Sequence, residues 1–414
     1  MKLTKLFCLM FLSAIPLFAN GGSLYSRYGI GDLRLSFSSR RLAMGELGIA
    51  LSDQQYLSDI NPAGWSELRL SRVETSFLYS GDKLETNNSS VYHSDVLFNG
   101  VMFGFPIEHG LGISTVFGLV PVSNVEYDVK EQSSDTSLVD PHTNEYKGTG
   151  GISKFMSGGS YKLPFGLSLG ISYDYYFGRI ENTSTITFVD NSTYRNASFK
   201  REMNYHGMGV SAGLISHDLS KYLGSSNLKN LKIGVTYSSS VTLSTDSIET
   251  LITTIGNVTD ADKTFDTKLP YRFGVGISFN WTDNYVFILD YLYQPFSSFT
   301  EDGLANKYLR DYSKYSFGFE YHDASARSAS FWDYIALRAG ASYEQSQYFV
   351  NGTGLNQFSV YAGFSMPISY DNTLDIGFQY GVRGTTDNNL LKDNFFRINF
   401  SASVGDIWFV RTER

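Results

Sequence analysis

The residue types that most often carry out chemistry are sparse and scattered along this chain. None of its six histidines pairs with another at a metal-site spacing such as His-x-x-x-His; they are His93, His109, His142, His206, His217 and His322. A phosphate-binding P-loop is also absent from the sequence. We therefore expect no metal, no cofactor and no enzyme activity. The alternative, a lipase or acyltransferase, would need a serine and a histidine brought together by the fold.

Residues 1–19 have the order of parts that defines a secretory signal peptide. Lys2 and Lys5 give a basic start, an apolar stretch runs from Leu6 to Phe18, and Ala19 supplies the small residue before cleavage. The stretch is too short to span a bilayer. The only cysteine, Cys8, lies inside it, so the mature chain is expected to have neither thiol chemistry nor disulfides.

The elements that follow residue 70 alternate with a period of two. In the stretch 374–382, the residues Leu374, Ile376, Phe378, Tyr380 and Val382 share one face, and the other face is polar or small. Such runs extend over about 9–11 residues, which suits a bilayer crossing. Fourteen strands are predicted near 71–80, 95–105, 110–121, 149–161, 166–178, 204–216, 230–241, 269–281, 285–296, 312–322, 332–344, 356–367, 373–383 and 394–404.

The connections between these strands alternate between short and long, which is typical of outer-membrane barrels. Long polar joins are expected at 81–94, 122–148, 179–203, 242–268, 297–311 and 345–355. The sequence thus predicts an all-β fold in which residues 71–405 form a transmembrane antiparallel β-barrel, followed by a tail at 406–414. Because fourteen is even, both chain ends would face the periplasm of a Gram-negative cell. The alternative, a soluble β-sandwich, usually has shorter strands.

Residues 20–70 are not used by the barrel and are predicted to fold into its lumen as a plug. Pro62 ends any helix at that point and restricts the backbone of Asn61. Ala63 is small enough to pack closely against the wall. The net charge of −8 argues against a nucleic-acid partner.

Three runs in this segment resemble the N-terminal hatch of the FadL/TodX outer-membrane transport family. They are Ala43-Met44-Gly45, Gly48-Ile49-Ala50 and Asn61-Pro62-Ala63-Gly64. The resemblance implies a barrel that carries hydrophobic compounds inward, with Asn61, Pro62 and Ala63 helping to gate the lumen. Glu46 departs from the family, which more often has a second glycine there. The same pattern is also similar to the barrel subunits of type IX secretion.

Two further groups of residues are candidates for function. The resemblance implies a kink in the third strand that opens a side window, and Gly118 and Pro121 are the residues there that interrupt a sheet ladder; the alternative is that Pro121 only marks the outer end of the strand. In strand 285–296, Val286, Ile288 and Leu292 are expected to face inward, against either the hatch or an apolar substrate.

The favoured hypothesis is passive uptake of hydrophobic small molecules, either fatty-acid-like or aromatic, through a channel gated by the hatch. The alternatives are a subunit of a secretion or surface-attachment assembly and a structural barrel. Expected partners are outer-membrane lipid and lipopolysaccharide, the hydrophobic substrate, and the barrel-assembly machinery. The last is expected because Phe396, Ile398 and Phe400 resemble the terminal-strand signal that this machinery reads.

Overall fold

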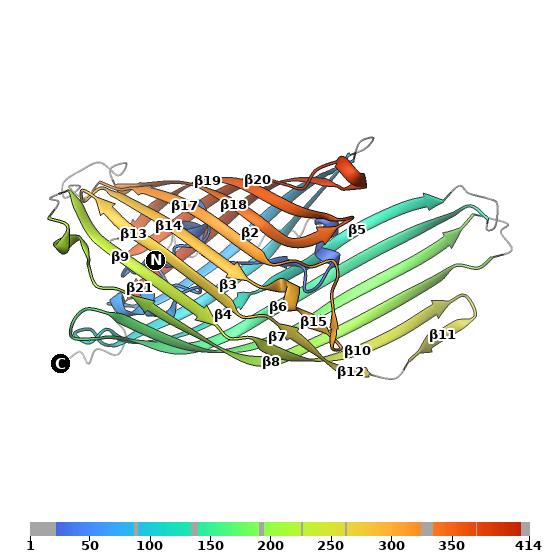
Figure 1. Ribbon diagram of the computed structural model, residues 1–414, viewed down its shortest axis with the longest axis horizontal. Coiled ribbons are helices and arrows are strands. Elements are labelled where there is room, and N and C mark those ends of the chain that lie inside the picture. The colour runs from blue at the N-terminus through green and yellow to red at the C-terminus, as the bar shows by residue number, and fades with distance from the viewer. Residues whose placement is uncertain are drawn as a thin grey trace, which may run out of the picture.

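The computed structural model describes residues 22–86, 90–133, 140–189, 194–224, 227–260, 263–323, 334–369 and 371–406. The expected signal peptide, residues 1–19, and nearly all of the expected C-terminal tail, residues 406–414, lie outside this described part. Within it, most of the chain is strand and very little is helix (Figure 1).

The strands close into an antiparallel barrel with fourteen strand positions. Closure occurs at β2 (Ser71–Glu85), which pairs with β3 on one side and with the last strand, β21, on the other. Three of these positions are each filled by two consecutive strands: β4 and β5, β9 and β10, and β12 and β13. The other barrel strands have the following bounds: β3 (Ser90–Glu108), β4 (Ile113–Pro121), β5 (Ser123–Ser133), β6 (His142–Lys162), β7 (Ser168–Phe188), β8 (Ala197–Ile215), β9 (Leu228–Ser238), β10 (Val241–Thr253), β12 (Lys263–Leu269), β13 (Arg272–Trp281), β14 (Tyr285–Gln294), β17 (Tyr312–Tyr321), β18 (Ala336–Val350), β19 (Thr353–Ser369), β20 (Asn372–Arg383) and β21 (Lys392–Asp406).

All fourteen predicted strands are confirmed, but several predicted long joins were wrong. Residues 123–133, 179–188, 197–203, 242–253 and 263–268, assigned to loops from the sequence, are strand. The outward residues of these parts are polar and form ion pairs, such as Lys147–Asp128 at 3.3 Å and Lys200–Glu202 at 2.7 Å. Their inward residues still include apolar side chains such as Val125 and Leu243. Because the outward face loses its apolar residues, the alternation is no longer clean there although the backbone ladder continues.

The two faces of the wall differ as the alternation predicted. Outward side chains form an exposed apolar surface that includes Phe117, Ile171, Leu289 and Phe317. Inward side chains are buried and are mostly serine, threonine and charged residues. An apolar exterior and a polar interior are typical of a membrane barrel.

The N-terminal segment, residues 22–70, is almost entirely buried and packs against the inward face of the wall. One large apolar cluster joins Ile30 and Leu47 of this segment to Ile180 and Leu243 of the wall. The segment contains only short elements: η1 (Leu24–Arg27), β1 (Asp32–Leu33), α2 (Ser39–Ala43) and η2 (Pro62–Glu67).

The remaining short elements lie in the connections. They are η3 (Ser220–Tyr222), β11 (Gly256–Thr259), η4 (Phe296–Ser298), β15 (Thr300–Glu301), β16 (Leu304–Ala305) and η6 (Asp387–Asn389). Among the helices of the described ranges, none has the length and apolar character needed to cross a membrane.

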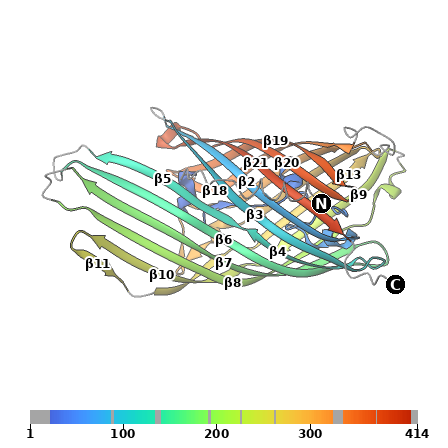
Figure 2. The same ribbon diagram turned by 180° about the vertical axis from the view of Figure 1, so that it is seen from behind.

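The two ends of the barrel are different. One end, here called the turn end, carries connections such as that between β13 and β14. At the opposite end, β5 to β8 and β10 to β12 extend well beyond the rest of the wall on one side (Figures 1 and 2). This one-sided extension is called the wing below.

Candidate functional site

Asn61 lies between the N-terminal segment and the wall and is fully buried. Its side-chain oxygen accepts a hydrogen bond from the amide of Ala63 at 3.0 Å, which caps η2. Its amide nitrogen donates to the carbonyl of Ile49 at 2.8 Å and lies 3.3 Å from the carbonyl of Val235 in β9. Pro62 occupies the first turn of η2, where its missing N–H costs nothing. Asn61 thus holds two parts of the segment to each other and to the wall.

Two wall glycines, which sequence reasoning missed, make room for this turn. A Cβ atom on Gly213 of β8 would lie 1.9 Å from the side-chain oxygen of Asn61. A Cβ atom on Gly170 of β7 would lie 2.2 Å from the carbonyl carbon of Pro62. Ala63 is fully buried at the same place. The signal available in the sequence was the presence of glycine at inward positions of neighbouring strands.

The apolar inward residues of β14 contact the N-terminal segment. Val286 and Ile288 are buried in one cluster with Met44 and Leu51. Leu292 is buried in the larger apolar cluster of the lumen. In this structure, therefore, these side chains are covered by the chain itself.

Asp290, on the same face of β14, anchors the segment through its backbone. Its carboxylate accepts hydrogen bonds from the amides of Gly48 at 2.8 Å and Ile49 at 3.0 Å. The second of the three motif runs therefore meets the wall at a buried carboxylate.

A buried ion-pair network crosses the lumen near the turn end. Arg40 of α2 donates two hydrogen bonds to Glu320 of β17, at 2.8 and 2.9 Å. Arg338 of β18 donates to Glu320 at 2.6 Å and to Asp375 of β20 at 2.9 Å. The Tyr56 hydroxyl donates to Asp375 at 2.9 Å, and the Arg40 guanidinium lies 4.6 Å from the centre of the Tyr56 ring. Glu320 and Asp375 thus each receive hydrogen bonds from both the segment and the wall.

A second network explains the departure at Glu46. Its backbone has a φ of 81°, a conformation that favours glycine. The Glu46 carboxylate pairs with Lys314 of β17, which is fully buried and also donates to Glu344 of β18 at 2.7 Å. The ion pair offsets the cost of placing a side chain where the backbone turns left-handed.

A third network lies toward the wing end. Arg383 of β20 donates to Asp32 of β1 at 2.6 and 3.1 Å and to Asp393 of β21 at 2.8 Å. The Tyr348 hydroxyl of β18 also donates to Asp32, at 2.7 Å. These three networks were not predicted, because each partner on the wall lies far along the chain from its partner in the segment.

The wall is interrupted directly after Pro121. On the side of Pro121 toward the turn end, β4 pairs with β3, and the last pair of this ladder is Val101 with Leu119. On the side of Pro121 toward the wing, the chain continues as β5, which pairs with β6. Within the described ranges no ladder joins β3 to β5, and the two strands diverge in Figure 2. Gly118 lies inside the regular ladder, packed between Met102 and Met156, and is not at the break.

The N-terminal segment occupies the lower part of the edge that this break exposes. β1 pairs antiparallel with β5, with Asp32 opposite Asn124 and Leu33 opposite Ser123. Further up, the hydroxyl of Ser26 donates to the carbonyl of Glu126 at 3.0 Å and accepts from its amide at 3.1 Å. The segment thus adds a short strand to the wall at its interruption.

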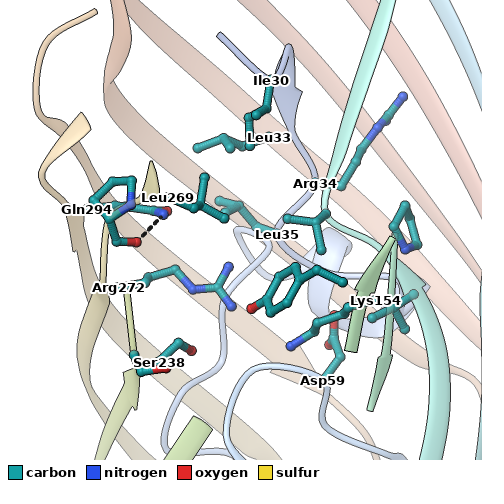
Figure 3. A pocket seen from close by; sticks show the side chains of 16 residues that line it. Ile30, Leu33, Arg34, Leu35, Asp59, Lys154, Ser238, Leu269, Arg272 and Gln294 are labelled. Atoms are coloured by element: carbon teal, nitrogen blue, oxygen red, sulfur yellow. Dashed lines mark hydrogen bonds between the residues drawn. The ribbon is translucent and has the colours of Figure 1, made fainter. Parts of the chain in front are cut away.

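A small cavity of about 30 Å³ lies beside the break. Figure 3 shows Leu33, Leu35 and Leu269 on one side of it, with Arg272 and Lys154 pointing into a common space from the other. Lys154 also pairs with Asp174 at 3.2 Å. The cavity therefore combines an apolar lining with cationic groups and the carboxyl group of Asp59.

A much larger vestibule of about 1110 Å³ opens at the turn end. Its lining includes Tyr56, Glu67, Lys162, Lys232 and His322. Arg40 and Glu320 belong to its lining, so the vestibule reaches inward as far as the N-terminal segment.

In the described ranges, no group of three His, Cys, Asp or Glu residues could hold a metal ion. The pattern Gly-x-Ser-x-Gly occurs around Ser168 and Ser211, but both serines lie within strands instead of a strand-to-helix elbow. Ser168 accepts from Ser66 at 2.7 Å, and Ser211 donates to Asp174 at 2.7 Å. Both serines thus serve packing between segment and wall or within the wall.

Solved structures that resemble this fold include transporters of hydrocarbons. The toluene transporter TbuX of Ralstonia pickettii is 15% identical, with 90% of this chain and 98% of that chain covered and a TM-score of 0.58. A FadL homologue of Pseudomonas aeruginosa is 10% identical, with 90% and 98% covered and a TM-score of 0.61. The toluene transporter TodX of Pseudomonas putida is 16% identical, with 88% and 97% covered and a TM-score of 0.57. The chain therefore has a FadL-like β-barrel fold.

Comparisons by sequence add a family. A family model described as BamG matches residues 1–413. No curated protein sequence matches the chain. These results do not support the resemblance to type IX secretion subunits, and that interpretation is set aside.

Proposed function

Since the chain belongs to the BamG family, we propose that it is a closed outer-membrane barrel that works as a subunit with the barrel-assembly machinery. The family name links its members to barrel assembly. The observation that carries the closed state is the set of buried ion pairs between the N-terminal segment and the wall. They involve Arg40 with Glu320, Glu46 with Lys314, and Asp32 with Arg383.

The energetics of these pairs favour a lumen that stays shut. Removing one partner of a buried, hydrogen-bonded ion pair costs about 3–5 kcal/mol, because the other charge is left without compensation. To clear the lumen, the segment would have to break all three networks and expose its apolar cluster. A barrel held shut in this way is suited to binding other proteins through its surface.

The proposed orientation follows the rule for outer-membrane barrels. The turn end and both termini would face the periplasm, and the wing would extend outside the cell. The apolar outer surface, with residues such as Phe317 and Leu289, would contact lipid. The polar outer side of the wing would lie among lipopolysaccharide.

Co-purification tests the proposal. Tagged protein produced at its natural level should co-purify with the central barrel subunit of the assembly machinery from mild detergent. The purified barrel should not make liposomes permeable to small solutes. A barrel recovered alone, even after cross-linking in intact cells, would overturn the proposed role in assembly.

A second candidate function is passive uptake of hydrophobic small molecules, favoured by the break in the wall beside the cavity of Figure 3. A fatty-acid-like molecule could place its acid group near Arg272 and Lys154 and its apolar part against Leu33 and Leu269. It would leave sideways at Pro121, and the N-terminal segment would act as the hatch. In this function the turn at Asn61, Pro62 and Ala63 helps to gate the lumen.

Uptake by whole cells distinguishes the two candidates. Deleting the gene should reduce uptake of a long-chain fatty acid or an aromatic hydrocarbon only if the barrel is a channel. In that case Asn61→Ala should change uptake while folded barrel in the same cells stays at its normal level. Normal uptake in the deletion strain would remove the channel function.

A further inference from the structure

Among the described residues, two strand edges next to the break have no partner strand. From Ser90 to Gly100, β3 pairs on one side with β2, and its ladder with β4 begins only at Val101. Above Asn124, the ladders of β5 in the described ranges are with β6 alone. An unpaired edge presents a row of backbone N–H and C=O groups that can template another strand.

The N-terminal segment shows how an added strand would sit on β5. The short ladder of β1 stops at Asn124, and Ser26 then satisfies both the amide and the carbonyl of Glu126. Backbone groups in a strand alternate between its two edges. The groups of Asp128, Lys130 and Gln132 therefore point to the same free edge as those of Glu126.

The side chain of Lys130 does not protect this edge. A lysine on an edge strand often discourages pairing. Here Lys130 pairs with Glu145 of β6 at 3.3 Å, so its side chain lies over the wall. The backbone beside it is left accessible.

The surroundings of the gap select the chemistry of an added strand. On the inward side of the gap, a cavity of about 20 Å³ has Asp82, Asp95 and Glu126 in its lining, together with Arg34 and Arg397. Asp32 also lines it but is already paired with Arg383. On the outward side of β3, Val96 and Phe98 are 65% and 49% exposed. One face of the gap is therefore charged, with three carboxylates against two guanidinium groups, and the other is apolar.

We propose that the free edge of β5 binds an extended segment of a partner protein, antiparallel to β5, whose residues alternate between basic and apolar. Its backbone would pair with Asp128, Lys130 and Gln132. Its basic side chains would face the inward carboxylates, and its apolar side chains would lie beside Val96 and Phe98. This is binding by strand addition, in which the main chain supplies affinity and alternate side chains supply specificity. The inference rests on the proposed function in that it names where a partner chain docks.

Synthetic peptides test this edge on the full-length barrel in micelles of a neutral detergent. The probe is an eight-residue peptide of alternating Lys and Val with blocked ends and a fluorophore. One control replaces Lys with Glu. The other keeps Lys and Val but carries N-methyl groups on alternate amides, so that one edge of the peptide cannot pair. Fluorescence anisotropy should show binding of the probe at least tenfold tighter than of either control.

A matched pair of variants locates the site. Lys130→Pro removes the amide donor on the free edge and leaves the ladder with β6 intact, because proline is tolerated where the N–H faces outward from an edge. Lys130→Ala loses the same side chain but keeps the amide. Binding of the probe should weaken at least tenfold in Lys130→Pro and change less than twofold in Lys130→Ala. Heat-shifted migration on a gel confirms that both barrels are folded.

Several outcomes would overturn the inference. These are equal binding of the N-methylated peptide, equal effects of the two Lys130 variants, and failure of the probe to bind. If Lys130→Pro does not fold, the N-methylated peptide still decides the question on the natural chain. If the peptide binds but the assembly machinery does not co-purify, the binding site on β5 stands and the proposed role in assembly is rejected. If the machinery still co-purifies with Lys130→Pro and the peptide does not bind, the role in assembly stands and the binding site on β5 is rejected.

Discussion

Arg40 and Glu320 meet inside the barrel through two parallel hydrogen bonds of 2.8 and 2.9 Å, although 280 positions separate them in the chain. Both side chains are at least nine-tenths buried. The pair joins α2 of the N-terminal segment to β17 of the wall. It is the clearest single link between segment and wall, and it makes the closed state testable.

Replacing either partner of this pair should loosen the segment. Arg40→Met leaves Glu320 with Arg338 as its remaining arginine partner, and Glu320→Met removes the carboxylate that Arg40 and Arg338 share. Each should therefore destabilise the closed state by up to about 3–5 kcal/mol, because a buried charge loses a hydrogen-bonded partner. The double variant should lose much less than the sum, because an apolar pair can replace a buried ion pair. Protease cleavage within residues 22–70 and the temperature at which the folded gel band disappears measure both effects. Additive losses would show that the pair does not act as a unit.

Filling the space at Gly213 should expel the turn at Asn61. Gly213→Leu places atoms where the Asn61 side chain lies, since even a Cβ atom would be 1.9 Å away. Overpacking of this kind costs about 1–3 kcal/mol or more. The barrel should still insert, but the segment should become sensitive to protease. Ala212→Leu, whose side chain points outward from the next position, is the matched control and should leave the segment protected.

Asp59 gives a pH dependence to the docking of the segment. Burial raises its pKa, and the nearby Arg41 and Lys154 offset this only in part. A carboxyl whose pKa is higher in the folded than in the unfolded state opposes folding when it is ionised, so stability should rise as pH falls through the folded pKa. Asp59→Asn should therefore raise the temperature of band loss at pH 7. The gain should shrink as the pH is lowered toward 4. A gain that does not depend on pH would contradict this explanation.

The outward face of β20 should tolerate apolar residues but not charge. Phe378 points outward and lies beside Phe364 and Phe396, with ring centres 6.5 and 6.4 Å away. Phe378→Arg should reduce insertion by about 2–4 kcal/mol if it lies near the bilayer midplane. Phe378→Leu should insert normally. The fraction of heat-shifted barrel in outer membranes measures both, and equal insertion would mean that this face does not contact lipid.

The strands could be predicted from the sequence because one alternating face had to be apolar. The same rule explains why β5 and β10 were missed: beyond the apolar belt the outward face is polar, as at Asp128, and only inward residues such as Val125 and Leu243 remain apolar. Pro121 was visible as an interruption. That a new strand starts two residues later was not visible, because pairing with β6 decides it.

The contacts of the lumen were harder to predict than its wall. Val286 and Ile288 could be placed on the inward face of a strand by alternation alone. That Met44 and Leu51 cover them depends on how the N-terminal segment folds back, which no local pattern encodes. The same holds for Lys314 and Glu46, where neither residue indicates its partner.

The links between the N-terminal segment and the wall also order events in time. Asp32, Arg40 and Glu46 are made early in synthesis, yet their partners Arg383, Glu320 and Lys314 lie in strands made near the end. Contacts between such distant parts of a chain are slow to form. We therefore expect the segment to dock only after these late strands have paired. Its protection from protease would then report that the barrel has closed.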